Sequence, residues 1–148
     1  MKTLTDKWYL LPLILIVLML IGKKAKGQVG NTEIPPDTLQ VKALLEAYGV
    51  KHVDIVLRQT VLETGWYKCT NCSMRYNNLF GFRLKKHVSD SNPLGYIPFK
   101  NWQESVKRFA WYQKTYYNEE KYPNYYDHIR NSGWSSSPTY VEYLKKMW

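Results

Sequence analysis

The stretch from Val53 to Arg83 constrains the fold most, because it places one carboxylate in a helix pattern that is otherwise mostly apolar. At about 100° per residue, two sides of the predicted helix are apolar, and only Asp54 and Arg58 form a polar side. Glu63 falls opposite that polar side, close to Gly65, which we expect to end the helix. Burying a lone acid is costly, so the pattern predicts an inward-facing acid with a chemical role.

The surroundings of Glu63 predict a raised pKa. Apolar neighbours and the negative end of the helix dipole both disfavour the charged form of its carboxyl group. A carboxyl group with a raised pKa can act as a general acid at neutral pH. The helix pattern alone also fits a solvated glutamate near a helix end.

Three runs of residues resemble a known family. They are 59–66 (Gln-Thr-Val-Leu-Glu-Thr-Gly-Trp), 77–83 (Asn-Asn-Leu-Phe-Gly-Phe-Arg), and 96–102 followed by Ser105-Val106. Together they are similar to the glucosaminidase domain of bacterial peptidoglycan hydrolases, the endo-β-N-acetylglucosaminidases of glycoside hydrolase family 73. The resemblance covers about Thr38 to Met147. It implies an α+β, mainly helical, lysozyme-like domain with a small β-lobe, and it places the catalytic acid at Glu63.

A glycosidase usually needs a second carboxylate, as a base or as a nucleophile. Between Glu63 and Glu104 the sequence offers one further acid, Asp90, in the turn Ser-Asp-Ser-Asn-Pro. We treat Asp90 as the candidate second catalytic residue, although ordinary turn chemistry also explains it. The alternative, which we favour slightly, is that the N-acetyl group of the substrate acts as the nucleophile. Glu104 is better explained as a helix-capping residue.

The resemblance also implies a set of residues that contact the substrate or hold the loops beside it. They are Gln59, Trp66, Asn77, Asn78, Phe80, Tyr96 and Tyr140. The aromatic members could equally be core residues, and the asparagines could cap or turn the backbone. Where the family has Tyr-Ala-x-Asp-Pro-x-Tyr, this chain has Trp134 to Tyr140, in which Trp134 replaces the first Tyr and Ser137 replaces the Asp.

The chain has 148 residues, enough for one domain after an N-terminal segment. Lys2 and Lys7 precede an apolar run at 8–21, which is too short to span a bilayer comfortably as a helix. We read residues 1–27 as a signal peptide cleaved after Gly27, and the lysines after the run as compatible with a retained anchor. Residues 28–37 form a linker, and 38–148 the glucosaminidase domain.

The charge balance fits an anionic, sugar-rich partner. Removing residues 1–27 takes away five lysines and Asp6, so the formal net charge falls from +9 to +5. Lys and Arg meet carboxylates and phosphates, and the abundant Tyr and Trp stack on sugar rings. Nucleic acid would fit the charge equally well, but the export signal argues against it. A basic surface could also serve solubility alone.

Cys69 and Cys72 are three positions apart, with no second cysteine pair and no suitably spaced histidines, so we expect no metal site. Outside the cytoplasm the pair favours a local disulfide over free thiols. No cofactor is implied.

The remaining pattern predicts helices at 38–48, 101–117, 125–131 and 137–147, and a β-hairpin within 82–100. We therefore expect a monomeric, exported hydrolase that cleaves the β-1,4 bond after N-acetylglucosamine in peptidoglycan glycan strands. It would be secreted or held in the cell envelope, with membrane contact only through residues 8–21 if they are retained. The rival readings are a lytic transglycosylase and a non-catalytic glycan-binding scaffold.

Overall fold

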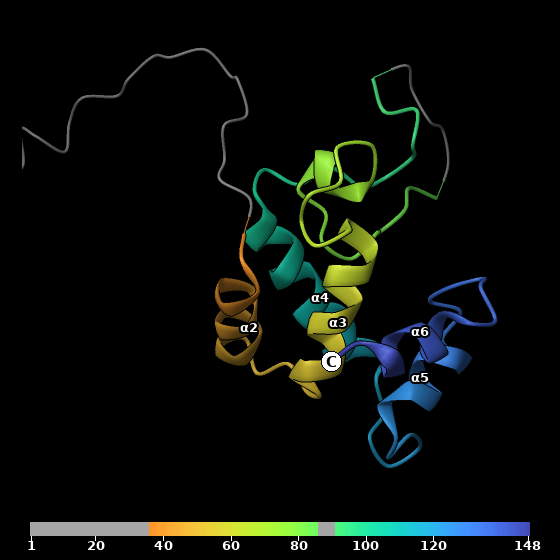
Figure 1. The fold of residues 1–148 in the computed structure, drawn as a ribbon. Coiled ribbons are helices and arrows are strands. Elements are labelled where there is room, and N and C mark those ends of the chain that lie inside the picture. Colours follow the sequence, from red (N-terminus) through yellow and green to blue (C-terminus); the bar gives the residue numbers. More distant parts are fainter. Residues whose placement is uncertain (1–35, 86–90) are drawn as a thin grey trace, which may run out of the picture. The chain divides into compact units, whose positions relative to one another are not determined.

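The structure, a computed structural model, describes residues 36–85 and 91–148, and the described part is mainly helical (Figure 1). Its helices are α2 (Thr38–Ala47), α3 (Val53–Thr64), the short 3-10 helix η1 (Ser73–Tyr76), α4 (Trp102–Tyr116), α5 (Tyr125–Asn131) and α6 (Tyr140–Lys146). The helices predicted from periodicity are thus confirmed within a few residues at each end. Within this part of the chain, no helix is long and apolar enough to cross a membrane.

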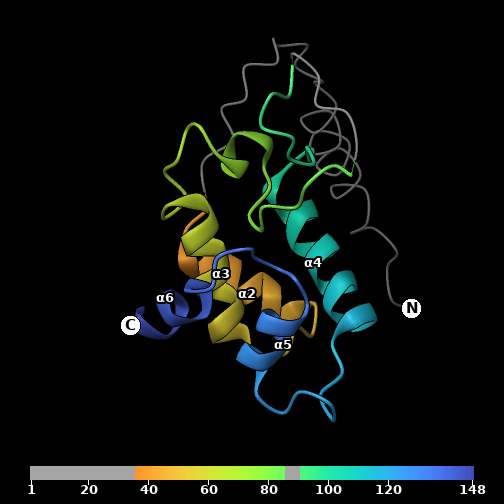
Figure 2. The same ribbon diagram turned by 90° about the vertical axis from the view of Figure 1, so that its right-hand side faces the viewer.

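Helix α3 is the centre of the arrangement, with α2 on one side and α6 on the other (Figures 1 and 2). Its residues Val56, Leu57 and Val61 are buried in one apolar core that also takes residues from α2, α4, α5 and α6. The αL backbone of Gly65, at φ +55°, ends α3 as the sequence predicts. The carboxyl end of α3 is thereby fixed where Glu63 lies.

Arg58 ties the C-terminal helix to α3. Its Nη1 donates to Tyr126 Oη at 3.1 Å and to the Leu144 carbonyl at 3.3 Å, and its Nη2 donates to the Trp148 carbonyl at 2.6 Å. The residue predicted to form the polar side of α3 is therefore used to hold α6 in place.

Helix α4 begins as its sequence predicts. Asn101 Oδ1 accepts from Glu104 N at 2.9 Å, and Glu104 Oε2 accepts from Lys100 N at 3.2 Å, so Glu104 is a capping residue. Helix α6 begins later than predicted. Ser137 and Pro138 form a turn before it, in which Tyr140 N donates to Ser137 O at 3.3 Å, and the helix itself starts at Tyr140.

The hairpin expected within 82–100 is represented by one antiparallel bridge, between Arg83 and Tyr96, and the described residues form no strand there. Side chains take over part of the pairing. Asn78 Nδ2 donates to the carbonyls of Phe82, at 2.9 Å, and Ile97, at 3.0 Å, and so links the two sides of this segment. The tip at 86–90, which includes Asp90, lies outside the described residues.

A cluster of aromatic rings joins this segment to α4 and to the loop before α6. The Phe80 ring stacks on Phe109 with centroids 4.2 Å apart. The Trp134 indole lies 5.7 Å from the rings of Phe82 and Phe109 and 5.3 Å from that of Tyr112. These contacts position Trp134 and the 80–82 segment relative to each other.

Candidate active site

Glu63 lies in the last turn of α3 and is half-buried. Tyr140, the first residue of α6, donates its phenol hydrogen to Glu63 Oε1 at 2.8 Å. Tyr140 is only 8 % exposed, so its hydroxyl is committed to this contact. The structure therefore brings together two predicted site residues that are 77 positions apart.

The pKa of Glu63 is raised above its ordinary value, as the sequence predicts. Burial is the main cause, and it outweighs the hydrogen bonds from Tyr140 and Trp134 and the charge of Arg83, which all lower the pKa. Among the groups that shift this pKa in the described part of the chain there is no carboxylate. A carboxyl group in these surroundings can hold a proton at a higher pH than a solvated glutamate can.

Tyr140 stays protonated. Burial raises the pKa of its phenol, and the neighbouring Glu63 raises it further. As long as the phenol donates to Glu63 Oε1, the proton of the carboxyl group lies on Oε2, which is the oxygen that can release it. Gln59 also acts on the Tyr140 phenol, although its own amide atoms make no hydrogen bond of ordinary geometry.

Gly81 lies against the other oxygen of the carboxyl group. A Cβ at this position would lie 2.7 Å from Glu63 Oε2, which is closer than carbon and oxygen can approach without a shift. The backbone of Gly81 also has a φ of +68°, which favours glycine. The space beside Oε2 therefore exists because residue 81 has no side chain.

Asn77 and Asn78 hold this loop from inside. Both are buried, at 7 % and 0 % exposure. Asn77 Nδ2 donates to the carbonyls of Phe99 and Lys100, and Asn78 Oδ1 accepts from the backbone N–H groups of Phe80 and Phe82. The Asn77 Nδ2 group and both amide atoms of Asn78 are therefore used within the protein, which fits a role in supporting the loop.

Two further predicted substrate contacts are also inside the protein. Gln59 is 0 % exposed, and Phe80 is 2 % exposed beneath the ring of Phe109. Neither side chain can reach a sugar in this structure. Phe80 belongs to the apolar core, as the alternative reading of it as a core aromatic has it, and Gln59 is a buried neighbour of Tyr140.

Trp66 and Tyr96 remain accessible. Trp66 is 55 % exposed just after α3, with its ring 5.1 Å from that of Trp148. Tyr96 is half-buried, and the Arg83 guanidinium lies 4.0 Å from its ring centroid and donates to its hydroxyl at 3.0 Å. Both rings are placed where a ligand could touch them.

Sequence reasoning missed two residues that act on Glu63, namely Arg83 and Trp134. Both belong to sequence runs that have a counterpart in the family that the chain resembles. Arg83 ends the Asn-Asn-Leu-Phe-Gly-Phe-Arg run, and Trp134 stands where the resemblance leads one to expect a tyrosine. Their proximity to the carboxyl group depends on long-range packing, which no local pattern encodes.

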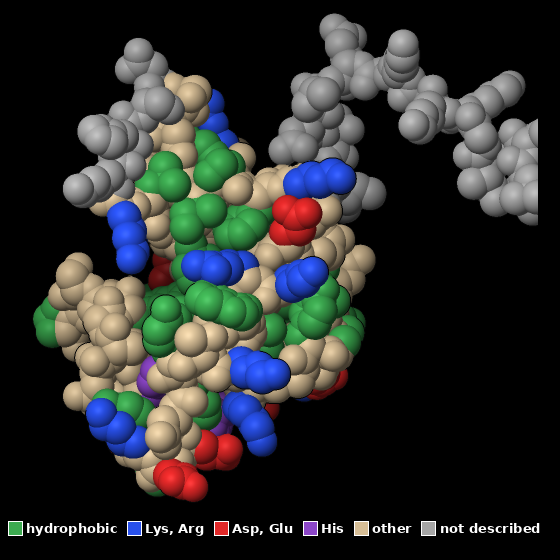
Figure 3. Space-filling view, turned by 180° about the vertical axis from the view of Figure 1, so that it is seen from behind, with side chains coloured by type: hydrophobic (Ala, Val, Ile, Leu, Met, Phe, Trp, Pro, Cys, Tyr) green, Lys and Arg blue, Asp and Glu red, His purple; other side chains and the backbone are tan. Residues whose placement is uncertain are grey.

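A pocket of about 630 Å³ opens beside these groups and is large enough for a sugar unit. Gly81, Arg83 and Trp134 line it on the side of Glu63, and Trp111, Tyr112 and Tyr116 of α4 line it on another side. On the face seen in Figure 3, an acidic side chain is recessed in a hollow bordered by hydrophobic and basic side chains. We call the pocket of about 630 Å³ the cleft pocket.

The cysteines do not form the predicted disulfide in this structure. Cys69 and Cys72 are free thiols, and Cys72 Sγ donates to the Cys69 carbonyl oxygen at 3.5 Å. Burial raises the pKa of the Cys72 thiol to about 11, so it stays protonated. In the described part of the chain, no cluster of three or more His, Cys, Asp or Glu side chains could hold a metal ion.

Comparison with known proteins gives one match. The sequence profile of the Glucosaminidase family, described as mannosyl-glycoprotein endo-beta-N-acetylglucosaminidase, matches residues 39–148. Neither a curated protein nor a solved structure matches the chain. The matched range contains every helix of the described part except for Thr38, the first residue of α2. It also contains the whole candidate site.

Proposed function

Because the chain belongs to the glucosaminidase family, we propose that Glu63 is the general acid of an endo-β-N-acetylglucosaminidase that acts on peptidoglycan. The family makes the chain a glycoside hydrolase whose reaction is cleavage of the β-1,4 bond after N-acetylglucosamine. The observation that carries the role of Glu63 is its geometry: Tyr140 holds Oε1, and the gap at Gly81 leaves Oε2 open.

In this mechanism, the proton of the Glu63 carboxyl group passes from Oε2 to the glycosidic oxygen as the bond between that oxygen and the sugar's anomeric carbon breaks. Tyr140 keeps its hydrogen bond to Oε1 and stabilises the carboxylate that remains. Water then adds its hydroxyl group to the anomeric carbon, and the remaining proton of the water restores the protonated Glu63 carboxyl group. The raised pKa of Glu63 supports this role, since the acid must be protonated when the substrate binds.

The second catalytic group is either Asp90 or the substrate's own acetamide, and we favour the acetamide. Asp90 lies outside the described residues, and among residues 36–85 and 91–148 no carboxylate shifts the pKa of Glu63. The anomer that is released first separates the routes, because acetamide participation retains configuration. An α product would mean inversion and would exclude the acetamide route. Asp90→Asn tests the carboxylate directly, and loss of activity in a folded variant would assign Asp90 the role.

The finer architecture follows the same reasoning. We take the domain to be lysozyme-like, with the segment around the Arg83–Tyr96 bridge as a small lobe facing the end of α3. Glycan strands would lie in the cleft pocket, against the accessible rings of Trp66 and Tyr96. Residues 1–27 would direct a monomeric protein out of the cytoplasm, as a cleaved signal peptide or as an anchor through 8–21. A disulfide between Cys69 and Cys72 would form only on oxidation after export.

The test is a zymogram on purified peptidoglycan, with wild type beside Glu63→Gln. The variant preserves shape and removes the transferable proton, so we expect cleavage to fall about 100-fold or more. Activity of the variant within a few-fold of wild type would remove Glu63 from the mechanism. The mass of the products is a second readout, because hydrolysis adds one water and a lytic transglycosylase would instead leave an anhydro sugar. Binding without cleavage by wild type would indicate a scaffold.

A further inference from the structure

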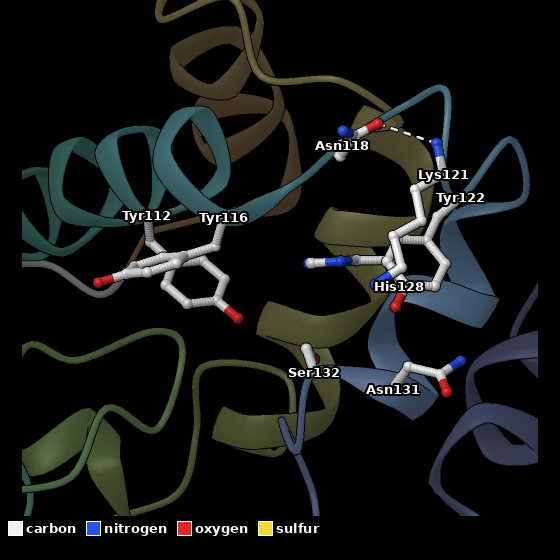
Figure 4. A pocket seen from close by; sticks show the side chains of 8 residues that line it. All are labelled: Tyr112, Tyr116, Asn118, Lys121, Tyr122, His128, Asn131 and Ser132. Atoms are coloured by element: carbon white, nitrogen blue, oxygen red, sulfur yellow. Dashed lines mark hydrogen bonds between the residues drawn. The ribbon is translucent and has the colours of Figure 1, made fainter.

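A second cavity, of about 540 Å³, lies between the carboxyl end of α4 and helix α5 (Figure 4). Tyrosines 112, 116 and 122 line it, together with Lys121, His128 and Asn131. We call it the tyrosine pocket. Nothing in the proposed mechanism uses it.

The tyrosine pocket adjoins the cleft pocket. Tyr112, Tyr116 and Ser132 line both cavities, so these three residues form a wall that the two cavities share. Gly81 and Trp134, which line the cleft pocket, lie next to Glu63. A chain-like ligand bound in the cleft pocket would therefore meet the tyrosine pocket as its next site.

The buried side chain of His128 indicates that the tyrosine pocket can bind a polar ligand. Its ring is 4 % exposed, and Nε2 is buried without a hydrogen-bond partner. Figure 4 shows the His128 imidazole reaching from α5 toward the side formed by Tyr112 and Tyr116. Rings of Tyr117, Tyr122 and Tyr125 pack around it at centroid distances of 5.0 to 5.6 Å. A buried polar atom without a partner is costly, and a ligand could satisfy it.

The chemistry of the lining indicates the occupant. Three aromatic rings offer flat apolar faces, while the side chains of Asn118, Asn131 and Ser132 offer amide and hydroxyl groups. Lys121 is the one formally charged residue of the lining, and its Nζ lies 5.1 Å from the Tyr122 ring centroid. His128 is neutral at neutral pH, since burial lowers its pKa. Such a surface suits an uncharged ring that has apolar faces and a rim of hydroxyl and amide groups.

We propose that the tyrosine pocket is a second sugar-binding site, which holds an N-acetylated pyranose of the same glycan strand away from the bond that is cleaved. This inference rests on the proposed function, because it extends the glycan site from the cleft pocket, whose lining residues Gly81 and Trp134 lie next to Glu63. It gives the enzyme a preference for long glycan strands over short fragments. Tyr122 and Tyr116 supply the stacking faces, and His128 Nε2 meets a polar group on the rim of the sugar.

The test compares a tetrasaccharide with an octasaccharide, both prepared from peptidoglycan and stripped of stem peptides. Tyr122→Ala removes a stacking face that belongs to the tyrosine pocket and not to the cleft pocket. We expect kcat/KM on the octasaccharide to fall about tenfold, the equivalent of one stacking contact, with kcat/KM on the tetrasaccharide unchanged. The matched control is Tyr143→Ala, a tyrosine of α6 that lines neither pocket, and it should leave both values unchanged.

A binding measurement keeps the inference separate from the chemistry. In the Glu63→Gln background, adding Tyr122→Ala should weaken octasaccharide binding by the same factor in calorimetry, measured at a temperature at which both variants are folded. Equal losses on both oligosaccharides, or no loss on either, would overturn the proposal. A loss seen only when stem peptides are retained would overturn the sugar assignment in favour of a peptide site. A wild-type enzyme that cleaves neither oligosaccharide nor intact peptidoglycan would instead refute the proposed function.

Discussion

At the scale of single residues, the contact between Tyr140 Oη and Glu63 Oε1 ties the protonation of the acid to the position of α6. The donor lowers the pKa of Glu63, against the larger rise caused by burial. Two opposed effects of this kind let small changes in the site tune the acid. The tyrosine is therefore a positioning residue that also sets the upper pH limit of activity.

Tyr140→Phe tests this double role. Removing the donor should raise the pKa of Glu63, so the acid would keep its proton to a higher pH and the alkaline limb of the kcat profile would move upward. Activity at its optimum should still fall, by about tenfold, because the remaining carboxylate loses its hydrogen bond. The measurement is a pH profile of glycan cleavage. A limb that moves to lower pH would contradict the assignment.

Gly81→Ala tests the space beside Oε2. A methyl group there would lie 2.7 Å from Glu63 Oε2 and force the carboxyl group to shift, so we expect at least about tenfold lower kcat. Gly49→Ala is the control, because Gly49 has a similar φ of +67° with nothing within 4 Å. Both variants carry similar backbone strain, so any further fall in the melting temperature of Gly81→Ala below that of Gly49→Ala measures the cost of the contact with Oε2. Equal activities of the two would show that the contact is irrelevant.

At the scale of elements, the loop from Asn77 to Arg83 matters most, because it carries Gly81 and Arg83 to the end of α3. Asn78 makes four hydrogen bonds, to backbone groups on both sides of the segment. A single buried side chain therefore adds to the two backbone hydrogen bonds, Leu84 N to Gly95 O and Ile97 N to Phe82 O, that join the two sides.

Asn78→Ala should destabilise the protein by about 3 kcal/mol, because it leaves several buried backbone groups without partners. Asn124→Ala is the comparison, since Asn124 is exposed and caps α5 through one bond to Tyr126 N at 3.1 Å. Its loss should cost about 1 kcal/mol. Urea unfolding measures both. Similar midpoints for the two variants would show that Asn78 is not the main support of the loop.

This contrast also explains which elements the sequence could predict. Helices α2 to α6 follow from periodic apolar residues and caps, which are local signals. The segment from 82 to 100 has the apolar residues and the turn residues of a hairpin. In its described part, two backbone hydrogen bonds and the Asn78 side chain join its two sides, and hydrogen bonds from a side chain cannot be read from the sequence pattern. Likewise the burial of Phe80 and Gln59 depends on what packs over them, so residue type alone could not separate core from cleft.

At the scale of the whole molecule, the candidate acid is a cost to stability. The pKa of Glu63 is raised in the folded protein above its usual 4.5, so folding is favoured at a pH below that value. The contribution is lost as the pH rises through the folded-state pKa. At neutral pH the folded protein therefore carries a carboxyl group that would be better solvated in the unfolded chain.

Glu63→Gln should consequently melt higher than wild type at pH 7, by roughly 3 °C, while the two should melt alike near pH 4. The amide is never charged, so it escapes the burial penalty and still accepts from Tyr140. Calorimetric melting at the two pH values measures the difference. A variant that is less stable than wild type at pH 7 would mean that the charged carboxylate is well stabilised in the folded state.

The aromatic cluster around Trp134 has an optical consequence. The indole lies among the rings of Phe82, Phe109 and Tyr112, lines the cleft pocket, and is close enough to Glu63 to lower the pKa of its carboxyl group. Its fluorescence depends on the charge and polarity next to the ring, and both change when Glu63 loses its proton or when a sugar displaces water. Trp134 is thus an intrinsic fluorescence probe of the site. The difference between the emission spectra of wild type and Trp134→Phe separates its signal from that of the other tryptophans.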